Sequence, residues 1–173
     1  MWERVLQTIL HEFSDIPDAE QATRVALRLT VAVLLGAAIG YERERRDSAA
    51  GLRTHMLVAL GAALFVLVPE QAGMPQADMS RVLQGVIAGV GFLGAGAVLK
   101  MSRNAEVRGL TTAAGIWATA AIGVTVGLGR EATALMATVM VVLILSVLYR
   151  LERYITRDGD QPSKPEPETD DDA

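Results

Sequence analysis

The chain has 173 residues, of which 51% are hydrophobic, 21% are charged and none is cysteine. The lack of cysteine excludes a disulfide framework, an iron–sulfur cluster and any zinc site built on thiolates. The net charge of −4, without a basic face, argues against nucleic acid as a partner. Long apolar runs alternate with short charged loops between Leu29 and Leu148. This pattern predicts a membrane protein.

Residues 1–16 predict a short amphipathic helix that lies in the membrane interface. Trp2, Leu6 and Ile9 repeat at helical spacing, with charged and polar residues between them. The apolar stretch is too interrupted, and its start too acidic, for a signal peptide. Asp18, with Gln21 three residues later, is typical of a helix N-terminus. We therefore expect the first membrane span to begin there.

Residues 17–156 predict an all-α domain of five transmembrane helices in a tightly packed bundle. A helix needs about 17 to 25 mainly apolar residues to cross a bilayer, and lipid offers no partner for unpaired backbone groups. The second span is short, so we expect it to extend into a flanking turn or to thin the bilayer locally. The expected spans are about Gln21–Tyr41, Thr54–Val68, Arg81–Leu99, Leu110–Leu128 and Ala132–Leu148.

Lysine and arginine residues are unevenly divided between the two sides of the predicted bundle. Eleven fall on the side of the C-terminus and five on the other side. Because cytoplasmic loops carry the excess of positive charge, we expect the N-terminus outside and the C-terminus in the cytoplasm. Residues 157–173 contain seven acidic residues, three prolines and no aromatic residue. This composition predicts a disordered acidic tail without a further domain.

Glycines four residues apart occur in three of the expected spans. Such pairs let another helix approach closely, either within one bundle or in a homodimer. A second interpretation concerns the glycine-dense stretch of residues 89–96, where a helix break could expose carbonyl groups along an ion path. Both interpretations stay open at this point. The glycines concerned are Gly36, Gly40, Gly85, Gly89, Gly91, Gly94, Gly96, Gly123 and Gly127.

Charged residues mark both edges of the predicted bundle. Arg28 lies within the first span, about 20 Å from its far end. It either extends toward the interface or pairs with an acid in the bundle interior. Glu42 and Glu44 lie at a helix C-terminus, where the helix dipole disfavours anions. We therefore expect a specific partner for them, either Arg53, Arg108 or a cation such as Mg²⁺, which typically binds one or two carboxylates.

Several long motifs resemble the MgtC/SapB family of bacterial inner-membrane proteins, in the right order along the chain. The resemblance covers about residues 28–127 and implies five membrane helices with a cytoplasmic C-terminus. The motifs are Arg28-Leu-x-x-Ala-x-x-x-Gly36-x-x-x-Gly40-x-Glu42-Arg43-Glu44, Ala50-Gly-Leu-Arg53-Thr54-His55, Asp78-x-x-Arg81, Gly89-Val-Gly-Phe-Leu-Gly-Ala-Gly96 and Val107-Arg108-Gly-Leu-Thr111-Thr112-Ala-Ala-Gly-Ile-Trp117.

The family resemblance implies a role in growth under magnesium limitation. It implies in particular a regulator that acts on other membrane proteins, including the ATP synthase. The chain lacks the cytoplasmic ACT-like domain of the longer members, so we expect it to correspond to the short ones. The motif positions form the candidate cation or regulatory cluster: Glu42, Arg43, Glu44, Arg53, Thr54, His55, Asp78, Arg81, Arg108, Thr111 and Thr112.

Two functions follow as hypotheses. In the first, the protein is a non-enzymatic regulator that binds another membrane protein, which the scarcity of acids at mid-membrane depth favours. In the second, it is a transporter or channel module, with Glu42, Glu44 and Asp78 handling Mg²⁺ or a proton. Asp78 and Arg81 could alternatively cap the third span and pair with each other. We expect no enzymatic activity and no resident cofactor, because no nucleophile–base pair or phosphate-binding loop is present.

Overall fold

The structure is a computed structural model that describes residues 1–12, 14, 18–101 and 109–159. In these ranges all regular structure is helical, which confirms the predicted all-α class. The helices are α1 (Trp2–Glu12), α2 (Ala19–Glu44), α3 (Leu52–Gln71), α4 (Gln76–Met101), α5 (Leu110–Gly127) and α6 (Glu131–Gly159).

Four of these helices, α2 to α5, are long and apolar enough to cross a membrane. They correspond to the first four expected spans. The short second span extends in both directions, and α3 reaches 20 residues, about 30 Å. It therefore matches the thickness of a bilayer core without thinning it. The fifth expected span corresponds to α6, whose described apolar part, Glu131–Val147, has 17 residues.

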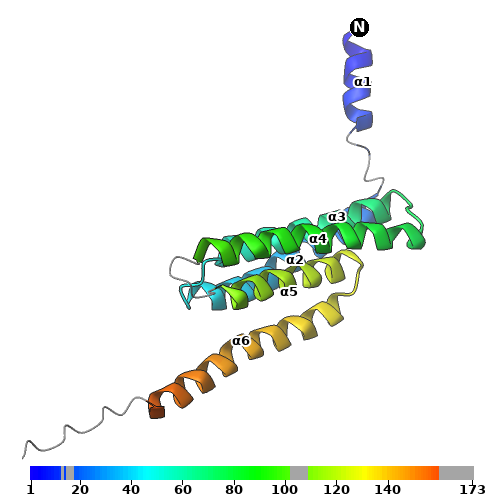
Figure 1. Cartoon of the computed structure of the whole chain (residues 1–173). Coiled ribbons are helices and arrows are strands. Elements are labelled where there is room, and N and C mark those ends of the chain that lie inside the picture. The colour runs from blue at the N-terminus through cyan, green and yellow to red at the C-terminus, as the bar shows by residue number, and fades with distance from the viewer. Residues whose placement is uncertain (13, 15–17, 102–108, 160–173) are drawn as a thin grey trace, which may run out of the picture.

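Helices α2 to α5 lie side by side and run alternately up and down, whereas α6 diverges from them along its length (Figure 1). Helix α3 packs against both α2 and α5, α4 packs mainly against α5, and the N-terminal part of α6 contacts α2 and α5. Helix α1 has no buried residue and makes no contact with another helix among the described residues. Its assignment to the membrane interface stays a prediction.

Glycine pairs on α2 and α5 bring these helices into backbone contact with α3. A Cβ atom added to Gly36 of α2 would lie 2.7 Å from the carbonyl oxygen of His55, and one added to Gly127 of α5 would lie 2.6 Å from that of Ala63. A Cβ at Gly123 would overlap the Ala59 carbonyl oxygen. The core of the bundle is therefore a three-helix unit with α3 at its centre, as expected for small residues at a helix interface.

Helix α4 is continuous from Gln76 to Met101. The interpretation of residues 89–96 as a helix break is therefore wrong, because the glycines of this stretch keep helical geometry. Gly94 is the α4 glycine that meets a neighbouring helix, with the Ala113 side chain 3.4 Å from an added Cβ. Added Cβ atoms at Gly85, Gly89, Gly91 and Gly96 would meet no described atom within 4 Å.

Helix α2 begins where the sequence predicts, whereas α6 extends beyond its predicted end. Asp18 is the N-cap of α2, and its side chain accepts a hydrogen bond of 2.7 Å from the Gln21 backbone N–H, as predicted. Helix α6 continues to Gly159, three residues into the expected tail. Residues 160–173 of that tail lie outside the described residues.

A matched pair of substitutions tests the backbone contact between α3 and α5. Gly123→Ala is expected to destabilise the protein by about 1–3 kcal/mol, because the added methyl group overlaps backbone atoms that cannot rotate away. Gly61→Ala, which adds the same group to open space on α3, should leave stability unchanged. The midpoints of thermal denaturation in one detergent measure both effects. Equal midpoints for the two variants would contradict the described packing.

Candidate functional site

Two polar clusters lie at opposite ends of the unit formed by α2, α3 and α5. One lies where α2 turns into α3, here called the α2–α3 end. The other lies where α3 turns into α4, here called the α3–α4 end (Figure 1). Each cluster joins helices whose apolar middle parts are in close contact.

Arg43 is the centre of the cluster at the α2–α3 end. Its guanidinium donates to the Ser48 hydroxyl at 3.0 Å and, at 3.5 Å, to the Thr112 hydroxyl at the start of α5. The two hydroxyl oxygens are themselves 3.0 Å apart. The structure thus brings together two predicted residues, Arg43 and Thr112, through Ser48, which sequence reasoning missed.

Glu42 and Glu44 both have partners within the protein. Glu42 forms an ion pair of 2.7 Å with Arg46, one helical turn later. Glu44 accepts a hydrogen bond of 2.8 Å from the backbone N–H of Leu52, the first residue of α3. Its carboxylate lies over Gly51, where an added Cβ would overlap it. Glu44 therefore caps α3 from outside, and the helix dipole of α3 stabilises the charge that the C-terminus of α2 disfavours.

His55 is fully buried between α3 and α5. Its Nδ1 lies 2.7 Å from the Thr119 hydroxyl, and that hydroxyl donates to the Gly115 carbonyl at 2.8 Å. Because threonine has a single hydroxyl hydrogen, the Nδ1–H of His55 is the donor to Thr119. The interaction joins α3 to α5 about two turns deeper along α5 than Thr112 of the Arg43 cluster. Thr119 carries no motif that could have identified it from the sequence.

The remaining predicted residues that the structure describes form no side-chain hydrogen bond or ion pair with the Arg43 cluster. Arg53, Thr54 and Thr111 are exposed. Asp78 and Arg81 lie at the opposite end, in the first turns of α4. Asp78 is in the first helical turn rather than at the N-cap position, and it forms no ion pair with Arg81 in the described part of the chain.

The structure also limits where a metal ion could bind. Arg108 lies outside the described residues. No three histidine, aspartate or glutamate side chains within residues 1–12, 14, 18–101 and 109–159 lie close enough to hold a metal ion. Glu42 and Glu44 have the chemistry for a hydrated Mg²⁺, but binding there would have to displace Arg46 and the Leu52 N–H.

Arg28 is the centre of the cluster at the α3–α4 end, and its side chain is 15% exposed. It forms an ion pair of 2.7 Å with Glu70 of α3 and donates to the Gly127 carbonyl of α5 at 2.9 Å. Its Nε lies 3.8 Å from the Glu131 carboxylate of α6. Arg28 thus pairs with acids, as one of the two expectations had it, but these lie at the exposed edge of the bundle and not in its interior, with 44% of the Glu70 and 37% of the Glu131 side chain exposed. One side chain of α2 thus contacts three other helices.

The turn between α5 and α6 is shaped to receive Arg28. Gly129 has a φ of +70°, a conformation that side chains disfavour. A Cβ atom at this position would also overlap the Arg28 guanidinium. The turn therefore requires glycine for two independent reasons.

Thr119→Val tests the buried His55 interaction. The substitution keeps the shape of the side chain but removes the acceptor for Nδ1–H, so it should lower stability by about 1–2 kcal/mol. Thr125→Val is the matched control, because the Thr125 hydroxyl bonds to the Ala121 carbonyl of its own helix. We expect a lower thermal midpoint for Thr119→Val alone. If the two variants lowered the thermal midpoint equally, the hydrogen bond between His55 and Thr119 would not contribute to stability.

Arg28→Gln tests the cluster at the α3–α4 end. Loss of the ion pair leaves Glu70 uncompensated, so we expect a destabilisation of about 1–3 kcal/mol, less than for a fully buried pair. Arg24→Gln removes an exposed ion pair on the same helix, Arg24–Glu20, and should change stability by less than about 1 kcal/mol. Chemical denaturation in detergent compares the two. A neutral Arg28→Gln variant would contradict the proposed connection of the four helices.

Comparisons with known proteins agree with this architecture. The sequence profile of the MgtC family matches residues 29–154. The chain is 47% identical over 140 residues to Protein SrpB of Synechococcus elongatus, covering 75% of this chain and 77% of SrpB. It is 42% identical over 135 residues to YhiD of Escherichia coli K12, covering 72% of this chain and 60% of YhiD. It is 46% identical over 124 residues to MgtC of Salmonella typhimurium, covering 72% of this chain and 52% of MgtC.

No solved structure gives a significant match to the chain. The family match includes most of α2, all of α3, α4 and α5, and the Arg43 cluster, and it begins one residue after Arg28. The chain covers only part of the longer relatives YhiD and MgtC. The chain therefore belongs to the MgtC family.

Proposed function

We propose that this protein acts in magnesium homeostasis as a non-enzymatic regulator of another membrane protein in the bacterial inner membrane. Support for magnesium comes from the family and from YhiD, a relative that carries the name "Putative magnesium transporter YhiD". Support for a regulator comes from the packing of the bundle. The partner that the family resemblance suggests is the ATP synthase.

The proposal includes five membrane spans, with the N-terminus outside and the C-terminus in the cytoplasm. Helix α6 has 29 residues and is about 43 Å long, which exceeds the roughly 30 Å of a bilayer core. The excess of lysine and arginine in the loops at the α2–α3 end and in the C-terminal segment supports this orientation. The Arg43 cluster would then face the cytoplasm, and the Arg28 cluster would face the outside.

The observation that carries the regulatory function is the backbone contact of α3 with α2 and α5. Helices whose backbones touch at Gly36 and Gly123 leave no space between them for a hydrated divalent cation, which keeps most of its water when it binds to proteins. The carboxylates at both ends of this unit are engaged with protein groups, Glu42 with Arg46, Glu44 with the Leu52 N–H and Glu70 with Arg28. This arrangement suits a rigid scaffold better than an ion path.

A transport function is the second candidate, and one observation favours it. Polar clusters lie at both ends of the same three helices, and His55 and Thr119 extend the cytoplasmic cluster by about two turns of α5 into the bundle. A conformational change that separated α3 from α5 would break the contact between His55 and Thr119 and expose both side chains to a passing ion. Transporters place their polar groups in such positions between packed helices.

Flux measurements in proteoliposomes distinguish the two functions. Purified protein is reconstituted with a trapped Mg²⁺-sensitive dye, and an ionophore provides the positive control. We expect no protein-dependent Mg²⁺ entry for the wild type, even with an imposed gradient and membrane potential. In the native host, loss of the gene should impair growth at low Mg²⁺ without changing the initial rate of Mg²⁺ uptake.

Two variants show whether any Mg²⁺ entry depends on the carboxylates at the α2–α3 end. Saturable Mg²⁺ entry that is lost in Glu42→Gln/Glu44→Gln, but kept in the exposed control Glu20→Gln, would overturn the regulatory function and place an ion site at the α2–α3 end. Saturable entry that survives in both variants would also overturn it and would exclude Glu42 and Glu44 as ion ligands.

A further inference from the structure

One face of α4 has no partner among the residues that the structure describes. Asp78, Arg81, Gly85, Gly89 and Phe92 follow one another at spacings of three and four residues, which places them on a single side of the helix. This set is called the outward face of α4. Gly94, nine residues after Gly85, lies on the opposite side, where it meets α5. The outward face therefore points away from α5, and its glycines Gly85 and Gly89 border an open groove between α4 and α3.

The outward face is open over its whole described length. Only 11% of the most apolar part of α4 is buried, compared with 22% to 50% for the other three membrane-span candidates. Phe92 is 80% exposed, and added Cβ atoms at Gly85 and Gly89 would meet nothing within 4 Å. The glycine pairs of α2 and α5, in contrast, are covered by α3.

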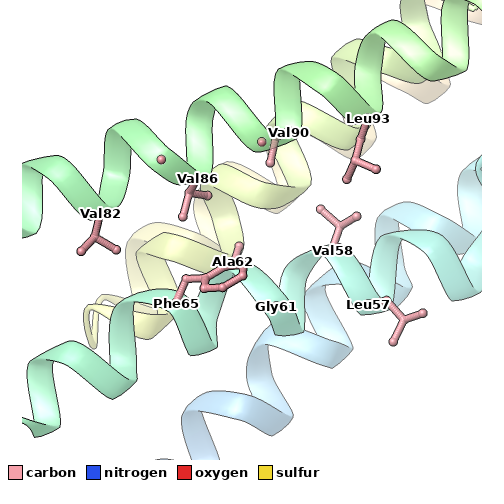
Figure 2. Close-up of a pocket in the computed structure, with 11 residues that line it drawn as sticks. Leu57, Val58, Gly61, Ala62, Phe65, Val82, Val86, Val90 and Leu93 are labelled. Carbon is pink, nitrogen blue, oxygen red and sulfur yellow. The ribbon is translucent and has the colours of Figure 1, made fainter.

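An apolar groove continues this face toward α3. Figure 2 shows its side chains, Val82, Val86, Val90 and Leu93 from α4 on one wall and Val58 and Phe65 from α3 on the other. The groove has a volume of about 620 Å³ and is lined entirely by apolar residues and glycine. An occupant of this surface must therefore present apolar side chains over the length of the membrane core.

The charges at one end of the outward face identify the occupant. Asp78 and Arg81 are both exposed, and neither forms an ion pair or side-chain hydrogen bond with any described residue. Two copies of the chain in one membrane share their orientation. If their α4 helices pack side by side about a two-fold axis, Asp78 of each copy lies beside Arg81 of the other. A lipid chain offers no such complement.

We propose that a second copy of this chain docks on the outward face of α4. The two α4 helices cross where Gly85 and Gly89 allow close approach, with Phe92 of each copy packed beside the crossing. Two Asp78–Arg81 ion pairs between the copies fix the register of the helices. The inference requires insertion of both copies with one topology, and it holds for a regulator and for a transporter alike.

Disulfide crosslinking in native membranes tests the interface directly, because the chain has no cysteine of its own. Gly85→Cys and Gly89→Cys should each give a covalent dimer on mild oxidation. Gly91→Cys is the matched control, since this glycine is equally open but lies on another side of α4. Crosslinking at Gly91 as efficient as at Gly85 would overturn the proposal, as would monomers or crosslinks to a different protein for all three variants.

A charge exchange tests the register. Asp78→Arg places four positive charges at the charged end of the proposed homodimer interface, and Arg81→Asp places four negative charges there. Each variant should self-associate about threefold or more weakly than the wild type, measured by energy transfer between labelled copies in liposomes. A mixture of the two variants restores both ion pairs and should associate as the wild type does. A mixture that associates no better than either variant alone would overturn the register.

Discussion

The contact of α3 with two neighbouring helix backbones is the constraint on which the rest of this structure depends. In a membrane the hydrophobic effect does not drive helices together, so close packing and polar contacts must do so. Glycines on α2 and α5 meet the alanines and carbonyl groups of α3 at distances that no larger residue permits. The α2–α3–α5 unit follows directly from these contacts, and the peripheral positions of α4 and α6 follow from their lack of comparable ones.

The glycine contacts hold the three helices together, and the two polar clusters fix their register. Tight packing in the middle of a helix pair still allows rotation and sliding, whereas hydrogen bonds at both ends define one register. Arg28 and Arg43 sit near opposite ends of α2, and each reaches α5. His55 joins α3 to α5 near one end of α3, and Glu70 joins α3 to α2 near the other end. The α2–α3–α5 unit is thus fixed at both ends. We therefore expect a conformational change to move α4 and α6 more easily than the helices of this unit.

The sequence predicted the four apolar helices α2 to α5 well because each is an apolar run bounded by charge. The same pattern could not reveal which glycine pairs are used. Gly36/Gly40, Gly85/Gly89 and Gly123/Gly127 look identical along the chain, yet the first and third pairs contact α3 and the second is open. That difference depends on which helix face meets a neighbour. The partner of Glu44 was also beyond prediction, because the tight turn that returns the chain to its carboxylate has no strong local signature.

The open glycine pair and the unpaired charges of α4 have one explanation. An isolated charge near the membrane edge has a less favourable environment than one in water, and pairing it there stabilises more than pairing it in solvent. Asp78 and Arg81 are one turn apart and form no ion pair with each other or with any other described residue. A second copy supplies both complements at once and covers Phe92 as well. A surface that is unfavourable on a single chain thereby becomes favourable in an assembly, which makes α4 the helix through which copies of this protein would influence one another.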